Sequence, residues 1–238
     1  MRWAAACLIL VVVSRPAFAE PLRYTARGTA TAVKSENVFH HALVLLNVLV
    51  DTDTAPESVG PDFARHLFAG PARLIFQHLD APPLCFAVSV PVECYVYNDA
   101  TDGGFDALIL SVVDFRLPGS AVDLCTFAGS DLSHSMWEDV AIPTVVQTSD
   151  FTHTEGFLTA ILDGYDSTPL YQVTSLTFDV RNNVPGDVEG DGDVTHEDLV
   201  RFSDALTTGD LRADFNFDCK VDLRDFAVLQ NHVTGAAE

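Results

Sequence analysis

A repeat near the C-terminus constrains this chain more than any other feature of the sequence. A shift of 27 residues, from Asp187 to Asp214, places DVEGDGDVTHEDLVRF on DFNFDCKVDLRDFAVL. Apolar positions coincide along with the acidic ones, because Leu199, Phe202 and Leu206 fall on Phe226, Leu229 and Val233. Their spacing predicts one face of a helix after each acidic run. An acidic linker would not repeat a helical face, so we predict two loop–helix units.

The polar residues of each repeat have the spacing of a twelve-residue calcium loop, with oxygen ligands at positions 1, 3, 5, 7, 9 and 12. Position 7 contributes only its backbone carbonyl, so a lysine is acceptable there. Oxygen ligands without His or Cys favour Ca²⁺ over zinc or copper. We therefore predict two Ca²⁺ ions, and folding of the repeat coupled to their binding. The predicted ligands are Asp187, Glu189, Asp191, Asp193, Thr195 and Asp198 in loop one (187–198), and Asp214, Asn216, Asp218, Lys220, Asp222 and Asp225 in loop two (214–225).

Two calcium loops, each followed but not preceded by a helix, make residues 184–238 resemble a type I dockerin domain. The resemblance implies docking onto a cohesin-like domain or another exported protein. It also implies that the residues at loop positions 10 and 11 recognise the partner. In this chain these residues are His196, Glu197, Leu223 and Arg224. Cys219 departs from the family pattern, since it replaces the glycine of position 6, where the backbone turns sharply. A left-handed backbone costs a non-glycine residue about 1–2 kcal/mol, so loop two is expected to be weaker or held by a disulfide.

Residues 20–183 have a different pattern, with short runs of Val, Ile, Leu, Thr, Phe and Tyr separated by Gly and Pro turns. Such a pattern is typical of an antiparallel, jelly-roll-like β-sandwich. VLVDTDTAPES and VYNDATDGGFDALIL loosely resemble the β-sandwich ectodomains of exported bacterial proteins. The runs that predict strands are residues 24–33, 40–51, 72–79, 85–90, 94–99, 105–113, 144–148, 157–162 and 171–180.

Residues 1–19 combine Arg2, a short apolar run and an Ala-x-Ala ending, which predicts a cleaved secretory signal. The apolar run is too short for a membrane anchor, so we expect a secreted or cell-surface protein without membrane insertion. The formal net charge of −21 argues against nucleic acid as a partner. In an oxidising compartment the four later cysteines allow three pairings, or buried free thiols. These cysteines are Cys85, Cys94, Cys125 and Cys219.

Residues 20–183 contain no nucleophile elbow, zinc-protease motif or phosphate loop, and we assign no catalytic residues. Asp102 and Asp106 are a carboxylate pair of the kind that hydrolyses sugars, but a chain this acidic contains many such pairs. The favoured hypothesis is an exported, calcium-binding, non-catalytic β protein tethered by its dockerin-like module. The alternatives are a small polysaccharide-active enzyme, a glycan-binding module, or a repeat that only caps the fold.

Overall fold

The computed structural model describes residues 21–33, 39–51, 53–78, 81–98, 105–113, 122, 124–132, 139–162 and 166–233, with the backbone alone at 160–162 and 166–169. The predicted signal at 1–19 and Asp102 lie outside the described residues. Among the described residues, no helix has the length and apolar character needed to span a membrane.

The described part of the N-terminal region is built of strands, joined into a single antiparallel sheet in the order β3-β4-β7-β8-β9-β11-β12-β1-β2-β5-β6, with β10 added on β12. The prediction of a mainly antiparallel β fold followed by a small helical part is confirmed. Hydrogen bonds run through the whole sheet rather than within two separate sheets. The strands are β1 (Leu22–Ala32), β2 (Leu43–Val50), β3 (Ser58–Val59), β4 (Phe63–Phe68), β5 (Ala72–Gln77), β6 (Leu84–Val88), β7 (Val92–Tyr97), β8 (Asp106–Val112), β9 (Leu124–Asp131), β10 (Val146–Gln147), β11 (His153–Leu162) and β12 (Asp166–Asn182).

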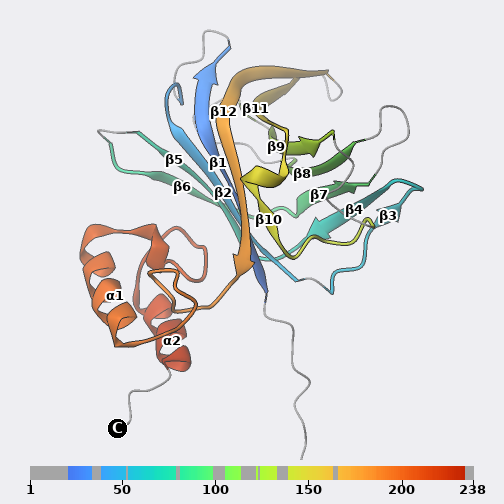
Figure 1. Ribbon diagram of the computed structural model, residues 1–238. Helices are drawn as coiled ribbons and strands as arrows, with labels where there is room; N and C mark the ends of the chain where they lie inside the picture. Colours follow the sequence, from blue (N-terminus) through green and yellow to red (C-terminus); the bar gives the residue numbers. More distant parts are fainter. Residues whose placement is uncertain are drawn as a thin grey trace, which may run out of the picture.

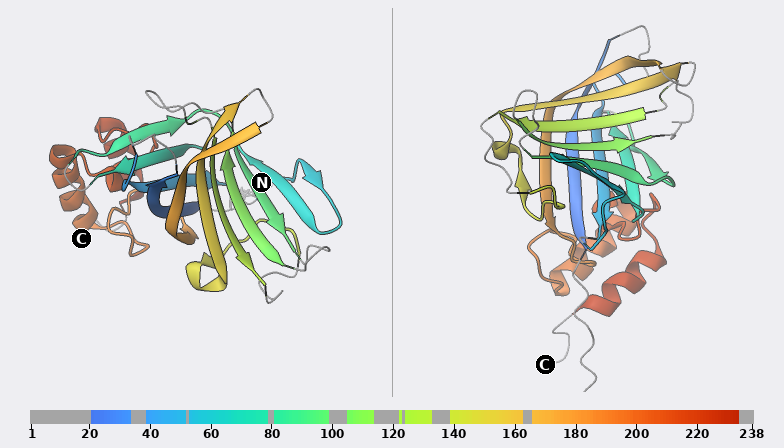
Figure 2. Two further views of the ribbon diagram at one scale, coloured as in Figure 1. Left: turned by 90° about the horizontal axis from the view of Figure 1, so that it is seen from above. Right: turned by 90° about the vertical axis from the view of Figure 1, so that its right-hand side faces the viewer.

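The sheet is strongly curved (Figures 1 and 2), so that a single cluster of apolar side chains fills the space it encloses. Tyr24, Phe76 and Tyr171 are among the largest side chains of this core. Ser175 takes a positive φ of 53° near the middle of the long strand β12. The pairing of β12 with β1 shifts register close to that residue, and β12 runs through the centre of the sheet.

Strand β5 is buried on both faces, whereas β4, β7 and β9 alternate between buried and half-buried side chains. Its residues Ala72, Leu74 and Phe76 belong to the enclosed core. Strand alternation therefore places Arg73 and Ile75 on the outer face, and both are buried as well. Something other than the sheet must cover this outer face, and Arg73 contacts the C-terminal module.

The C-terminal module has its own apolar cluster around helices α1 (His196–Thr208) and α2 (Leu223–His232). A short 3₁₀ turn, η2 (Leu211–Ala213), lies between them, and another, η1 (Thr148–Asp150), follows β10. Both helices lie beside the β5–β6 edge of the sheet (Figure 1). Phe202 and Leu229 are buried as the repeat predicted, but the prediction was wrong for Leu206, which is 43% exposed while Ala205 is buried.

The four cysteines within the described residues form one disulfide, between Cys85 on β6 and Cys219 in loop two. Cys94 and Cys125 are free thiols buried in the core. Burial raises the pKa of both thiols, to about 12 for Cys125. Of the alternatives that the sequence left open, the structure therefore combines one disulfide with two buried thiols.

Candidate metal centre

The two loops repeat the same local geometry, beginning with the aspartate at position 12. Asp198 accepts hydrogen bonds from the backbone amides of Val188 and Thr195, both at 2.8 Å. Asp225 accepts the equivalent bonds from Phe215 at 2.8 Å and Asp222 at 2.9 Å. Position 9 caps the following helix through its side chain in both units. Each position-12 carboxylate is fully buried and ties the start of its loop to the start of its helix.

The aspartates at positions 1 and 5 also have matching partners. At position 1, Asp187 accepts the amide of Gly192 at 2.9 Å, and Asp214 accepts the amide of Cys219 at 3.0 Å. At position 5, Asp191 and Asp218 each accept the amide two residues further on, at 3.0 and 3.1 Å. The 27-residue repeat of the sequence is therefore a repeat of contacts as well.

The backbone has positive φ at positions 4 and 6 of both loops. Loop one places Gly190 (83°) and Gly192 (94°) there, and loop two places Phe217 (61°) and Cys219 (67°). Glycine adopts this conformation without strain, whereas other L residues do not. Loop two thus holds two strained residues, and both contact the β domain: Cys219 through its disulfide and Phe217 through arginine side chains.

Loop one keeps most of its negative charge. Five carboxylates lie at its ligand positions, and the arginine that forms an ion pair with one of them is Arg201, whose guanidinium pairs with Glu189 and with the neighbouring Glu197. Burial is the largest cause of the raised pKa of Glu189, and Arg201 opposes the rise. Oxygen donors alone, with this excess of negative charge, fit a hard divalent cation.

Loop two contains a buried ion pair with the β domain. The Nη1 atom of Arg73 donates to the Asp214 carboxylate at 2.6 Å and to the Asp214 carbonyl at 3.1 Å. The side chains of Arg73 and Asp214 are 4% and 0% exposed. Burial raises the pKa of Asp214, and Arg73 opposes this rise. The Arg73 guanidinium also lies 4.5 Å from the centre of the Phe217 ring, within the range of a cation–π contact.

Arg23, from β1, lies on the same ring at 5.4 Å and donates to Asn183 at 2.8 Å. Burial, more than the neighbouring Arg73, lowers the pKa of Arg23 to about 10, so Arg23 is charged at neutral pH. Loop two therefore packs, through the Phe217 ring, against the guanidinium groups of Arg23 and Arg73 on the sheet.

All twelve predicted ligands lie in the two loops, but in the described part of the chain no three His, Cys, Asp or Glu side chains converge on a common point. The carboxylates at positions 1, 5 and 12 accept hydrogen bonds from backbone amides. Lys220, at position 7, is exposed, which leaves only its carbonyl as a ligand group. The sequence did not identify Arg73 or Arg23, since neither belongs to the repeat.

The four predicted partner-reading residues are exposed at the first turns of the two helices. Leu223 is 75% exposed, which is unusual for a leucine. Its neighbour Arg224 contacts Asp218 at 3.0 Å and Asp222 at 2.8 Å.

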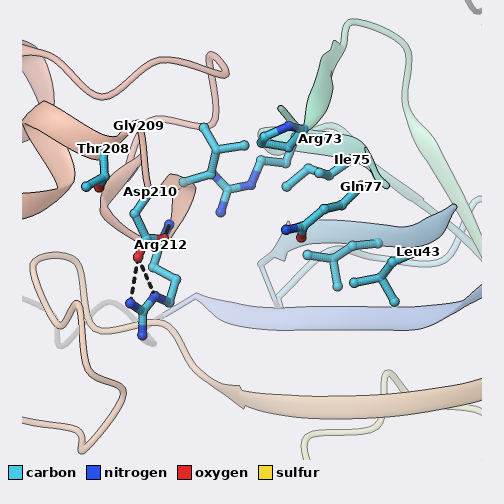
Figure 3. Close-up of a pocket in the computed structure, with 11 residues that line it drawn as sticks. Leu43, Arg73, Ile75, Gln77, Thr208, Gly209, Asp210 and Arg212 are labelled. Atoms are coloured by element: carbon cyan, nitrogen blue, oxygen red, sulfur yellow. Dashed lines mark hydrogen bonds and ion pairs between the residues drawn. The ribbon is translucent and has the colours of Figure 1, made fainter. Parts of the chain in front are cut away.

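A pocket of about 400 Å³ lies where the module meets the sheet (Figure 3). Leu43, Ile75 and Gln77 line it on the sheet side, and residues 208–212 line it on the module side. Its one acidic residue, Asp210, is paired with Arg212 at 2.5 Å, so the pocket has no pair of carboxylates. Asp106 is fully buried on β8, opposite Asp131 of β9.

Comparison with known proteins identifies the C-terminal part of the chain. Residues 185–234 match the family model described as the dockerin type I domain. The matched segment spans both loops and both helices, and dockerin domains generally bind calcium. No curated protein and no solved structure matches the chain.

Proposed function

We propose that this chain is an exported calcium-binding protein in which a non-catalytic β domain is tethered, through its dockerin-like module, to a cohesin-like or cell-surface partner. The observation that carries the proposal is the repeated loop geometry within residues 185–234, the segment that matches the dockerin type I family. Dockerin domains occur in extracellular and cell-surface proteins.

Calcium binding is proposed first for loop one. Its side-chain ligands are Asp187, Glu189, Asp191, Thr195 and Asp198, and Asp193 contributes its carbonyl. A bound cation neutralises carboxylates that otherwise repel one another at the start of α1. Loop two offers the same kinds of oxygen but a different balance of charge, because Arg73 already pairs with Asp214.

The effect of Ca²⁺ on the fold tests this part of the proposal. Far-UV circular dichroism of the full chain is expected to show more helix, and a higher thermal midpoint, with Ca²⁺ than with excess chelator. Magnesium at the same concentration is the control for ionic strength. Equal helicity and equal midpoints in Ca²⁺ and chelator would contradict calcium-coupled folding.

The partner-binding surface is proposed at the first turns of α1 and α2, where His196, Glu197, Leu223 and Arg224 are exposed. The sheet covers a different side of the module, around Asp214 and Cys219. Helix starts that point to solvent suit contact with a second protein, and an exposed leucine suits an apolar contact within it.

Binding to purified cohesin domains, measured with the full chain immobilised in Ca²⁺ and then in chelator, tests tethering. The double variants His196→Ala/Glu197→Ala and Leu223→Ala/Arg224→Ala determine which helix start carries the contact. Asp204→Asn, an exposed change further along α1, is the matched control. At least one double variant is expected to weaken binding tenfold or more, roughly the cost of losing interface anchors. Binding that neither double variant changes would exclude these positions.

The non-catalytic part of the proposal is supported by the lining of the pocket between module and sheet, in which the single carboxylate is already paired. Most glycoside hydrolases use two carboxylates that flank the scissile bond. Release of reducing sugar from a panel of polysaccharides would contradict this part of the proposal and favour the enzyme alternative.

A further inference from the structure

The two loops differ in what surrounds their position-1 aspartate, although their internal contacts match. Loop one has no hydrogen bond from the β domain to Asp187 among the described residues. In loop two, Arg73 reaches Asp214 from β5 and bonds to both its carboxylate and its carbonyl. A guanidinium therefore lies against the aspartate that begins loop two, at the residue that would bind the ion.

The balance of charge differs in the same direction. In loop one, five carboxylates have one ion-paired arginine, Arg201. Arg181 lies beside Gly190 and Arg23 interacts with Asp187 without an ion pair. Four carboxylates of loop two face Arg73, which pairs with Asp214, and Arg224, which pairs with Asp218 and Asp222. Lys220 adds a further positive charge within loop two. Counted by its ion-paired arginines and Lys220, loop two is therefore nearer to neutral without an added cation than loop one.

Burial makes the contact of Arg73 hard to displace. A buried charge without its partner is strongly unfavourable, so a cation that drew Asp214 away would leave Arg73 unpaired on the covered face of β5. A cation bound beside Arg73 would also be repelled by it. Phe217 and Cys219 reinforce the position, because the ring packs on Arg73 and the disulfide fixes the loop to β6.

We infer that Arg73 takes the place of the second Ca²⁺ ion, so that loop two is a metal-free docking element that holds the module on the sheet. This inference rests on the proposed binding of Ca²⁺ by loop one, and it changes the expected stoichiometry from two ions to one. The calcium dependence of the module is then confined to loop one and α1, while loop two stays folded in chelator.

Hydrogen exchange of the full chain, measured in Ca²⁺ and in excess chelator, tests the inference loop by loop. The amides of Gly190 and Gly192 are expected to lose protection when Ca²⁺ is removed. Those of Asp218 and Cys219, which bond to Asp214, are expected to keep theirs. Loss of protection in both loops would overturn the inference and leave calcium binding intact. No change in loop one would instead contradict the proposed function.

A matched pair of variants gives the stoichiometry. Asp191→Asn and Asp218→Asn change the same loop position, and asparagine retains the oxygen that accepts the amide. Titration with Ca²⁺ is expected to show one ion for the wild type, affinity weakened about tenfold or more by Asp191→Asn, and no change with Asp218→Asn. A wild-type stoichiometry of two, or loss of an ion in Asp218→Asn, would overturn the inference.

Arg73→Gln tests the role of the guanidinium itself. It removes the charge beside Asp214, so loop two is expected to lose protection in chelator and to recover it in Ca²⁺. Arg65→Gln, which removes a less buried arginine paired with Glu57 and Glu93 on the same sheet, is the control. Full protection of loop two in Arg73→Gln with chelator would show that Arg73 does not serve as its cation.

Discussion

At the scale of single residues, Asp187 and Asp214 have the same loop position and the same bond to the amide at position 6. Their surroundings separate them, because Asp214 is fully buried against Arg73. The repeat predicted both aspartates as metal ligands at position 1 of their loops. It could not predict the contact, since Arg73 lies 141 residues earlier in the chain.

Removal of each aspartate should therefore have different consequences. In chelator, Asp214→Ala is expected to lower the free energy of unfolding by about 3–5 kcal/mol, because it leaves Arg73 buried and unpaired. Asp187→Ala should cost about 1 kcal/mol, the value of its amide hydrogen bonds. Urea denaturation in chelator measures both, with Asp210→Ala as a control for a less buried pair. Equal losses would mean that the Arg73–Asp214 pair adds no stability.

Cys219 combines a disulfide with a left-handed backbone, and two double variants separate these contributions. Cys85→Ser/Cys219→Gly and Cys85→Ser/Cys219→Ala both remove the disulfide, which is expected to cost about 2–5 kcal/mol. Only glycine adopts the φ of 67° freely, so the glycine variant should be the more stable of the two by about 1–2 kcal/mol. Thermal denaturation compares them. An alanine variant as stable as the glycine variant would show that the loop relaxes once the disulfide is gone.

At the scale of elements, apolar runs identified most strands, because the buried side chains of a strand leave a recognisable pattern of apolar residues in the sequence. Each of the nine predicted runs overlaps a strand, but β4 and β9 were missed along with the two-residue β3. The buried residues of β4 include His66, and β9 contains Gly129 and two buried polar or small residues, so neither has a run of apolar letters. The helix starts were predicted better, because Thr195 and Asp222 are capping residues.

The repeat predicted that Phe202 and Leu206 share the buried face of α1, but in the structure only Phe202 is buried. A pair of variants compares the contribution of the two side chains to stability. Phe202→Ala is expected to destabilise the module by about 3–5 kcal/mol, because Phe202 is 1% exposed within its small core. Leu206→Ala should cost less than about 1 kcal/mol, since Leu206 is 43% exposed and lies outside the buried core of the module. Loss of helical signal on denaturation in Ca²⁺ measures both. A large effect of Leu206→Ala would restore the helical face that the repeat predicted.

At the scale of the whole molecule, the sequence did not predict how the parts meet. Neighbours in the sheet are far apart in the chain, as when β1 pairs with β12, and no local pattern records such pairing. The burial of the outer face of β5 was not predicted either. Nothing in the sequence around Arg73 and Ile75 shows that the module covers these two residues. The Cys85–Cys219 bridge, with a sequence separation of 134, depends on the same arrangement.

The module should therefore stabilise the β domain. A chain that ends after Asn183 exposes Ile75 and removes the partner of Arg73, so it is expected to lose about 2–3 kcal/mol of stability. The same truncation with Arg73→Gln should be about as stable as the truncated wild type, because Arg73 is solvated once the module is gone. Urea denaturation followed by tyrosine fluorescence measures the β domain in each chain. A truncated domain as stable as the full chain would mean that the module only rests on the sheet.

The arrangement of attachments has a mechanical consequence. The module continues directly from β12, in the middle of the sheet, and is bonded again to β6, at its edge. In the proposed tethering, tension applied to the module by an anchored partner would be shared between two strands, with Arg73 on β5 between them. Two attachment points restrict rotation of the β domain relative to the module. The β domain would therefore keep a fixed orientation towards the surface that carries the partner.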